Sequence, residues 1–294
     1  MNQGTSRGTY YTGIDRFRFL SALLIIAIHT SPLLSFSETG NFVLTRIVAR
    51  VAVPFFFMTS GFFLLSGYSR NRERLMDFIK KTGLIYGIAI LIYIPVNIYN
   101  GYFTKVGMVP KLIQDIVFDG TLYHLWYLPA AILGGTIAWC LVRKFGYPKA
   151  LTGALLLYLI GLFGDSYYGL AERISGVHGF YQLVFQVSDY TRNGIFFAPV
   201  FFVLGGLMAR RPSKPSIGKS LLGLTVSFTL MLGEALLLRH FRLQRHDSMY
   251  LFLLPCLYFL FQTLLHFRGR HLGGLRTVSL IIYIIHPMMI LAVR

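Results

Sequence analysis

An arginine and a histidine stand eleven residues apart in the first long apolar stretch of the chain, at Arg18 and His29. At about 100° per residue, this spacing brings both side chains to nearly the same face of a helix, roughly 16 Å apart along its axis. A guanidinium binds anions, and an imidazole exchanges protons near pH 7. Ionisable groups inside a membrane helix are costly and usually functional. Snorkelling of Arg18 and an interhelical hydrogen bond from His29 are the structural alternatives.

The stretch RVAVPFFFMTSGFFL, residues 50–64, carries a second polar group in an apolar setting. Arg50 opens it and requires a carboxylate, a carbonyl or a ligand anion. Pro54 interrupts the predicted helix and frees a backbone carbonyl. Ser60 and Gly61 are small enough to let another helix approach closely. The stretch predicts a kinked helix with a substrate-facing arginine, or a purely structural one with a paired arginine.

Further polar residues stand at the ends of apolar stretches or inside them, and we predict that they contribute to substrate binding. Trp126 and Tyr127 also suit an aromatic belt at the membrane surface. Glu234 is the only carboxylate well inside a predicted helix, where it either pairs with an arginine or stays protonated. The predicted substrate-binding residues are Arg50, Ser60, His124, Trp126, Tyr127, Arg192, Asn193, Glu234, His246, Asp247, Tyr283 and His286.

The elements that position these residues are predicted to be membrane helices. The chain is 55% hydrophobic and only 13% charged, whereas a soluble domain carries roughly twice that charged fraction. Its apolar runs are long enough to cross a hydrocarbon core about 30 Å thick. We predict an all-α, polytopic transmembrane bundle of about nine helices, near 17–34, 47–66, 80–98, 123–142, 149–164, 194–209, 219–238, 248–266 and 277–293.

The net charge of +17 is interpreted as topology rather than nucleic-acid binding. Lysine and arginine concentrate in alternate connecting segments, and the positive-inside rule then places the N-terminus in the cytoplasm. The segment 239–247, RHFRLQRHD, is an exception because it is basic and predicted to lie outside. Nine helices from an inside N-terminus leave the C-terminus outside, so one more helix is expected in a longer protein.

Other functional classes lack their sequence signatures. Cys140 and Cys256 both lie inside apolar runs, which favours packing over a disulfide framework. The chain has no P-loop, no dinucleotide-binding glycine pattern and no Cys/His spacing typical of a metal site. We predict no metal and no cofactor bound to this chain.

Several of these stretches together resemble the acyltransferase-3 family of membrane proteins. That family's first helix carries an Arg and a His separated by ten residues, as Arg18 and His29 are. VPFFFMTSGFFL, HLWYL and SLIIYIIHP resemble its other signatures, in the same order. The resemblance covers nearly the whole chain. It implies that residues 1–294 form one acyltransferase-3-like transmembrane domain, with His29 and Arg18 as catalytic residues.

A narrower resemblance is to the membrane half of VanT-type membrane-bound serine (serine/alanine) racemases. It rests on GIDRFRFL…AIHTSPL, LYHLWYLPA, YLIGLFGDSYYGL, TRNGIFFAPVF and RHDSMYLFL. The resemblance implies a multi-pass cell-membrane domain that serves vancomycin resistance and peptidoglycan synthesis. In that family a C-terminal pyridoxal-phosphate racemase domain follows, through which a homodimer is expected. This chain lacks that domain, so we expect no racemase (isomerase) activity from it alone.

Two functions remain open at this stage. The first is binding and import of L-serine, or another small polar substrate, across the lipid bilayer; Pro54 and Pro129 supply candidate helix breaks. The second, implied by the wider family, is an O-acyltransferase that moves an acyl group from cytoplasmic acyl-CoA to an extracytoplasmic hydroxyl. His29 would then be the general base, while Arg18 and Arg50 would hold phosphates or the oxyanion.

Overall fold

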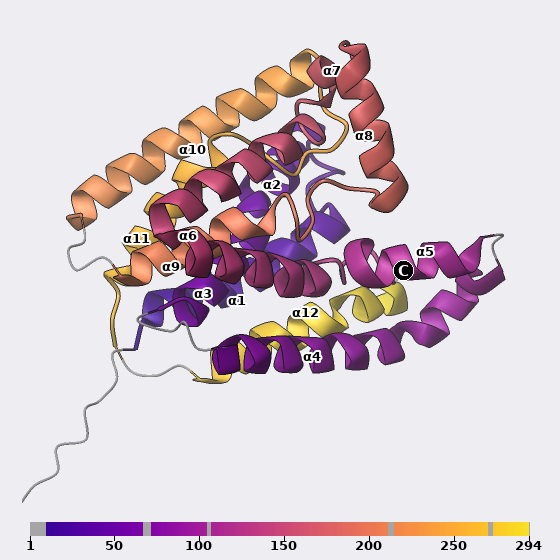
Figure 1. Ribbon diagram of the computed structural model, residues 1–294, viewed down its shortest axis with the longest axis horizontal. Helices are drawn as coiled ribbons and strands as arrows, with labels where there is room; N and C mark the ends of the chain where they lie inside the picture. Colours follow the sequence, from indigo (N-terminus) through magenta and orange to yellow (C-terminus); the bar gives the residue numbers. More distant parts are fainter. Residues whose placement is uncertain (1–9, 67–71, 105–106, 211–214, 270–272, 294) are drawn as a thin grey trace, which may run out of the picture. The chain divides into compact units, whose positions relative to one another are not determined.

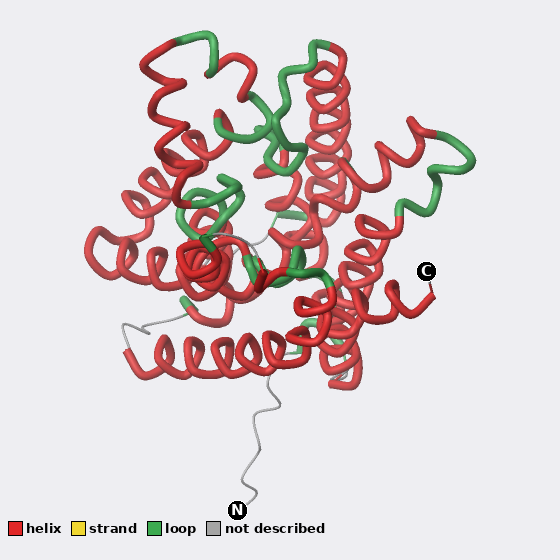
Figure 2. The backbone as a smooth tube through the Cα atoms, turned by 90° about the vertical axis from the view of Figure 1, so that its right-hand side faces the viewer, coloured by secondary structure: helices red, strands yellow, loops and turns green. Residues whose placement is uncertain are grey.

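The computed structural model describes residues 10–66, 72–104, 107–210, 215–269 and 273–293, and these ranges are helical with no strand (Figure 2). Residues 1–9 of the predicted cytoplasmic N-terminus, and Arg294, lie outside them. The α-helices labelled in Figure 1 are α1 (Thr12–Thr30), α2 (Glu38–Arg46), α3 (Ala52–Leu64), α4 (Arg72–Tyr99), α5 (Met108–Gln114), α6 (Tyr127–Phe163), α7 (Tyr168–Ala171), α8 (Ser175–Val187), α9 (Ala198–Arg210), α10 (Ile217–His240), α11 (Leu253–Leu265) and α12 (Gly273–Val293). Three short elements lie between them: the 3₁₀ helices η1 (Val48–Val51) and η2 (Tyr102–Thr104), and the π-turn η3 (Asp115–Asp119).

Five helical segments in the described ranges are long and apolar enough to cross a membrane. They are Glu38–Leu64, Arg72–Tyr99, Tyr127–Phe163, Ile217–His240 and Gly274–Val293. The apolar helices α9 and α11 have 13 residues each, fewer than the about 20 that a full crossing needs. The prediction of an all-α membrane protein is therefore confirmed.

Every predicted range overlaps a helix, but the ends differ for physical reasons. The first helix ends at Thr30 instead of residue 34, because Ser31 adopts the left-handed conformation with φ 48°. The ranges 123–142 and 149–164 both overlap α6, which begins at Tyr127, ends at Phe163 and is broken at Gly146 with φ 74° and ψ 169°. Glycine accepts that conformation without steric cost, so a single residue divides two nearly continuous helices.

Two details of the predicted helices were wrong. Pro54 lies in the first turn of α3 and does not interrupt it, since first-turn N–H groups have no partner within their own helix. The connection 165–192, for which no helix is predicted, contains α7 and α8. α8 has one buried residue, Tyr181, so its apolar pattern was too short and too exposed to resemble a membrane helix.

The chain divides into two compact units, which are described separately. One comprises the described residues of 1–55, 213–229 and 255–294, and the other those of 56–212 and 230–254. In the first, α1 packs along α12, and the N–H of Gly13 donates to the carbonyl of Phe267 at 3.1 Å. Phe55 joins α1 to α11 through ring contacts with Phe17 and Phe261, at centroid distances of 4.7 and 5.9 Å.

In the second unit, α6 packs extensively against α9, as Figure 1 shows. The backbones of α3 and α9 approach each other very closely where the two helices cross. A Cβ added at Gly61 would lie 2.1 Å from the carbonyl oxygen of Phe202, and one at Gly205 would lie 2.0 Å from that of Met58. The two glycines therefore let the helix backbones touch, which confirms the close approach predicted at Ser60-Gly61.

This crossing gives a direct test of packing. Gly61→Ala is expected to destabilise the protein by about 2 kcal/mol, because the new methyl meets backbone that cannot move aside. Gly87→Ala in α4 is the matched control, since nothing lies within 4 Å of its added Cβ; it should be neutral or slightly stabilising. Thermal unfolding in detergent measures both, and equal melting temperatures for the two variants would contradict the tight crossing.

Candidate functional site

His29 and His286 form a ring pair in the first unit. Their rings are nearly parallel, with an interplanar angle of 22° and centroids 5.4 Å apart. α1 supplies His29, which is half-buried, and α12 supplies His286, which is 4% exposed. The buried ring of Tyr283 lies one turn before His286, at a centroid distance of 6.4 Å. Three predicted site residues therefore meet at the packed face of α1 and α12.

Arg18 lies on α1 and is paired with a carboxylate. Its guanidinium lies 2.9 Å from Asp15, and the two side chains are 12% and 14% exposed. Asp15 was not singled out from the sequence, although its position three residues before Arg18 on a helix could have revealed the pair. Arg50 belongs to the same unit, in η1, which packs against α1. The first unit thus holds both predicted catalytic residues and one predicted anion-binding residue.

An apolar cavity of about 480 Å³ lies beside the histidine pair. His286 and Thr30 are the polar residues in its wall. The remaining lining residues are Ile26, Ile281, Ile282, Ile285, Met289, Ile290 and Val293. The setting of the pair is therefore mainly hydrocarbon, in which polar contacts are strengthened.

The second unit holds the other predicted residues, in a dense aromatic cluster. His124 is 3% exposed and meets the ring of Tyr93 edge-on at 5.0 Å. Tyr127 stacks on Phe57 at 4.9 Å. Trp126 contacts the face of the Arg192 guanidinium, whose Cζ lies 4.5 Å from the ring centroid. Tyr190 lies at the same distance from Arg192. Arg192 is thus held between two aromatic rings, a position that suits its flat, weakly hydrated charge.

Asn193 shapes the turn that leads into α9. Its side-chain oxygen accepts hydrogen bonds from the N–H groups of Ile195 and Phe196, at 2.9 and 3.1 Å. Its amide nitrogen donates to the carbonyl of Tyr190 at 2.9 Å. These contacts fix the backbone next to Arg192, which is a positioning role. Ser60 lies half-buried in α3, next to the close crossing at Gly61.

Glu234 holds the residues just before α11 through hydrogen bonds. Its carboxylate accepts hydrogen bonds from the Tyr167 hydroxyl at 2.8 Å and from the N–H groups of Leu251 and Phe252, at 2.6 and 3.0 Å. These donors take the place of the arginine that the sequence suggested. The helix begins at Leu253 and not at residue 248, so the predicted start of the range 248–266 was wrong, and His246 and Asp247 do not directly precede the helix. Both lie half-buried in the preceding loop.

A second buried carboxylate, Asp165, fixes the same loop. Its Oδ1 accepts from the N–H groups of Ser248 and Met249, at 2.8 and 3.0 Å, and from the Ser166 hydroxyl at 2.9 Å. Asp165 is fully buried, and its carbonyl accepts from the N–H of Arg245 at 3.1 Å. Its role was not predicted, because a lone aspartate after a helix looks like an ordinary loop residue.

The basic segment 239–247 is held by rings as well as by Asp165. The Arg245 guanidinium lies 3.3 Å from the ring centroid of Phe185. The ring of His246 lies 4.4 Å from that of Tyr190. Arg245 and His246 are therefore held by neighbouring aromatic rings. These contacts account for the basic residues in this part of the segment without a bound ligand.

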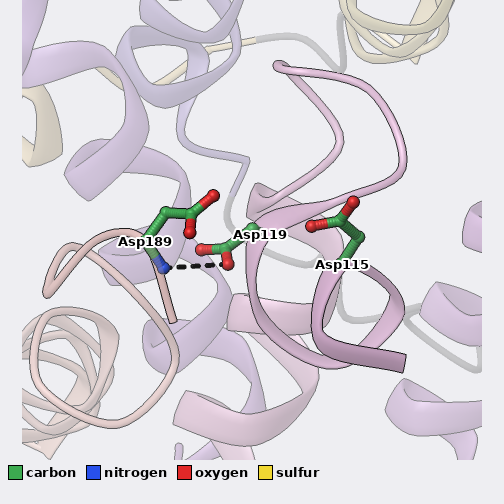
Figure 3. Close-up of side chains that lie close together, drawn as sticks. All are labelled: Asp115, Asp119 and Asp189. Carbon is green, nitrogen blue, oxygen red and sulfur yellow. Dashed lines mark hydrogen bonds between the residues drawn. The ribbon is translucent and has the colours of Figure 1, made fainter. Parts of the chain in front are cut away.

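Three acidic groups gather where α5 and η3 meet the loop after α8 (Figure 3). Asp119 accepts from the N–H of Asp189 at 3.0 Å. The Lys111 ammonium lies 3.0 Å from Asp115 and 2.7 Å from Asp189. Burial raises the pKa of the Asp119 carboxyl, against the opposing hydrogen bonds from Asp189 and Gln114. Because Lys111 already supplies positive charge to the cluster, we assign it no metal.

The contacts join three segments that lie on one side of the membrane if the predicted helices cross it in turn from a cytoplasmic N-terminus. Lys111 and Asp119 reach Asp189, and the N–H of Gly169 donates to the carbonyl of Leu243 at 2.7 Å. The connections 99–122, 164–193 and 241–252 therefore lie at the same end of the second unit. This agrees with the predicted order of crossings.

The predicted site residues are divided between the two units. Arg18, His29 and Arg50 belong to the first, whereas His124 and Tyr127 belong to the second.

Comparisons with known proteins place these features in a family. A family described as an acyltransferase domain matches residues 11–294. An amino-acid racemase of Enterococcus faecalis is 63% identical over 270 residues, which cover 92% of this chain and 38% of that protein. Another from the same species is 39% identical over 291 residues, with coverage of 96% and 41%. A serine/alanine racemase of Enterococcus gallinarum is 39% identical over 287 residues, with coverage of 94% and 40%.

The chain spans about two fifths of the length of these relatives. No solved structure matches it. Its five candidate spans and its family match identify a membrane protein. From the match over almost its full length, the chain belongs to the acyltransferase-3 family and is similar to the matched part of enterococcal amino-acid racemases.

Proposed function

We propose that this chain is the cell-membrane domain of a serine racemase, and that it binds L-serine and imports it for conversion to D-serine. The observation that carries the proposal is the match of the whole helical region to about two fifths of proteins named amino-acid or serine/alanine racemases. A racemase that shares its chain with a membrane domain gains most if that domain delivers its substrate. D-Serine would then enter cell-wall precursors and contribute to vancomycin resistance.

The remaining parts of the proposal follow from the same relatives. A pyridoxal-phosphate racemase domain would act in the cytoplasm, and two copies of the protein would associate through it. The N-terminus of the membrane domain would also be cytoplasmic. The shared end of the connections 99–122, 164–193 and 241–252 supports this topology, because the predicted order of crossings from a cytoplasmic N-terminus puts all three on the outer side, although the segment 239–247 is basic.

Side chains in the first unit suit a zwitterionic amino acid. Arg50 has a guanidinium that matches the geometry of a carboxylate. His29, His286 and Tyr283 supply hydrogen-bonding groups next to the α1–α12 contact. Transporter sites often lie near the membrane midplane at irregular helices, and α12 carries Pro287 within its span. These features support a binding site for serine in this unit.

Acyl transfer is the second candidate, and the family match over residues 11–294 favours it. In this case His29 would accept a proton from an acceptor hydroxyl, and Arg18 and Arg50 would stabilise the acyl donor or the oxyanion. The acyl group would come from a cytoplasmic acyl-CoA.

Reconstitution in proteoliposomes separates the two candidates. One sample receives labelled L-serine, and another receives acyl-CoA with a hydroxyl acceptor and a thiol probe. We expect accumulation of serine without release of thiol. Release of thiol without accumulation of serine would favour acyl transfer instead. His240→Ala is the matched control for histidine variants, because His240 is exposed at the end of α10.

A further inference from the structure

The α12 span contains a proline at a position that affects the backbone directly. Pro287 lies inside the helix and has no N–H to donate to the carbonyl four residues earlier, that of Tyr283. In a membrane span, a carbonyl deprived of its helical donor must be satisfied by another group of the protein or by water. A side chain of the same helix donates a hydrogen bond to the Tyr283 carbonyl in place of the missing N–H.

His286 supplies the missing donor. Its Nδ1 lies 3.0 Å from the carbonyl oxygen of Tyr283 and 3.1 Å from that of Ile282. Carbonyl oxygens only accept hydrogen bonds, so Nδ1 carries the proton. In a neutral imidazole the lone pair is then on Nε2. Pro287 leaves the Tyr283 carbonyl available as an acceptor, and the Nδ1–H of His286 donates to it. The sequence His286-Pro287 therefore fixes the tautomer of the imidazole.

The ring of His286, held in this way, contacts the ring of His29. The two rings are nearly parallel, with centroids 5.4 Å apart, and they come from helices that pack along each other. The bonds to two carbonyls hold the ring of His286 and restrict its rotation. The ring of Tyr283, on the same helix, also lies near that of His286. His29 is therefore in contact with a ring that is held by the backbone.

We propose that His286 is a positioning residue for His29, and that Pro287 fixes His286 as the Nδ1–H tautomer. The effect on transport rests on the proposed function, whereas the tautomer and the ring contact do not. Pro287 leaves the Tyr283 carbonyl without its helical donor. His286 donates to that carbonyl, and this hydrogen bond holds its ring in place beside His29.

Nuclear magnetic resonance of the full chain with ¹⁵N-labelled imidazoles tests the tautomer. The chain has eight histidines, so His286→Asn identifies the His286 signals by their loss. The expected signals are a protonated Nδ1 and an unprotonated Nε2 for His286 at neutral pH. In Pro287→Ala the new N–H of residue 287 can bond to the Tyr283 carbonyl, and the ring should shift toward the Nε2–H tautomer. An Nε2–H tautomer in the wild type, or an unchanged signal in Pro287→Ala, would overturn the role of Pro287.

The positioning role has its own test. Asn at position 286 keeps an N–H donor for the carbonyls but has no ring to stack on His29. In His286→Asn the His29 signals should shift, and L-serine uptake should fall about tenfold although the protein stays folded. Full uptake together with unshifted His29 signals would show that His286 only satisfies the carbonyl, and would refute positioning. If the wild type does not transport serine, the proposed function fails, but the His29 signals still decide the positioning claim.

Discussion

Replacement of His29 by alanine is expected to reduce L-serine uptake at least about tenfold while the protein remains folded and inserted. The loss corresponds to about 1.4 kcal/mol, the size of one substrate hydrogen bond. The half-buried position of His29 lets water or lipid fill the space that the ring leaves, so the stability cost should be small. If the domain transfers acyl groups instead, thiol release should fall by about a hundredfold or more, as is usual for a lost general base.

Uptake in proteoliposomes measures this effect, with equal amounts of protein verified after reconstitution. His240→Ala should behave like the wild type, because it removes an exposed imidazole far from the ring pair in sequence. Normal serine uptake and normal thiol release in His29→Ala would refute a functional role for this residue.

Replacement of Asp165 by alanine should give the largest loss of stability, about 3 kcal/mol. Its Oδ1 accepts three hydrogen bonds, from the N–H groups of Ser248 and Met249 and from the Ser166 hydroxyl. The Ser166 hydroxyl can donate instead to the His246 carbonyl at 3.1 Å, but each N–H left without an acceptor in a buried site costs about 1–3 kcal/mol. A loss of this size should lower the melting temperature in detergent by several degrees.

Asp165→Asn is the matched variant for this prediction. The three hydrogen bonds all end on one oxygen, and the carbonyl oxygen of asparagine can accept them in the same place. The substitution should therefore keep most of the stability that alanine loses. A melting temperature for Asp165→Asn as low as that for Asp165→Ala would mean that the charge, and not the acceptor oxygen, stabilises the loop.

The fold was predictable from the sequence because apolar length determines a membrane helix almost alone. The break inside α6 was predicted to within a few residues, since Gly146 and Pro148 both disfavour a continuous helix. The start of α11 was not predicted. Residues 248–252 are mostly apolar, like the helix that follows, but Asp165 and Glu234 bind their N–H groups and hold them outside the helix. These carboxylates lie 83 and 17 residues away from the N–H groups that they bind, and no local pattern reveals such contacts.

The candidate site was predictable in part for a related reason. Helical spacing identified His29 and Arg18, and the polar residues of the SLIIYIIHP stretch, Tyr283 and His286, identified the last helix as a candidate. Sequence spacing could not show that His29 and His286 form one ring pair, because their helices are the first and the last in the described chain. It also could not show that Asn193 and Glu234 are committed to backbone N–H groups.

Equilibrium binding of labelled L-serine to the purified chain in detergent tests the central claim most directly. We expect saturable binding that excess unlabelled L-serine displaces, that His29→Ala weakens at least about tenfold, and that His240→Ala leaves unchanged. Binding that does not saturate at millimolar serine, in protein that is folded and releases thiol from acyl-CoA, would contradict serine recognition and favour acyl transfer as the function of the domain.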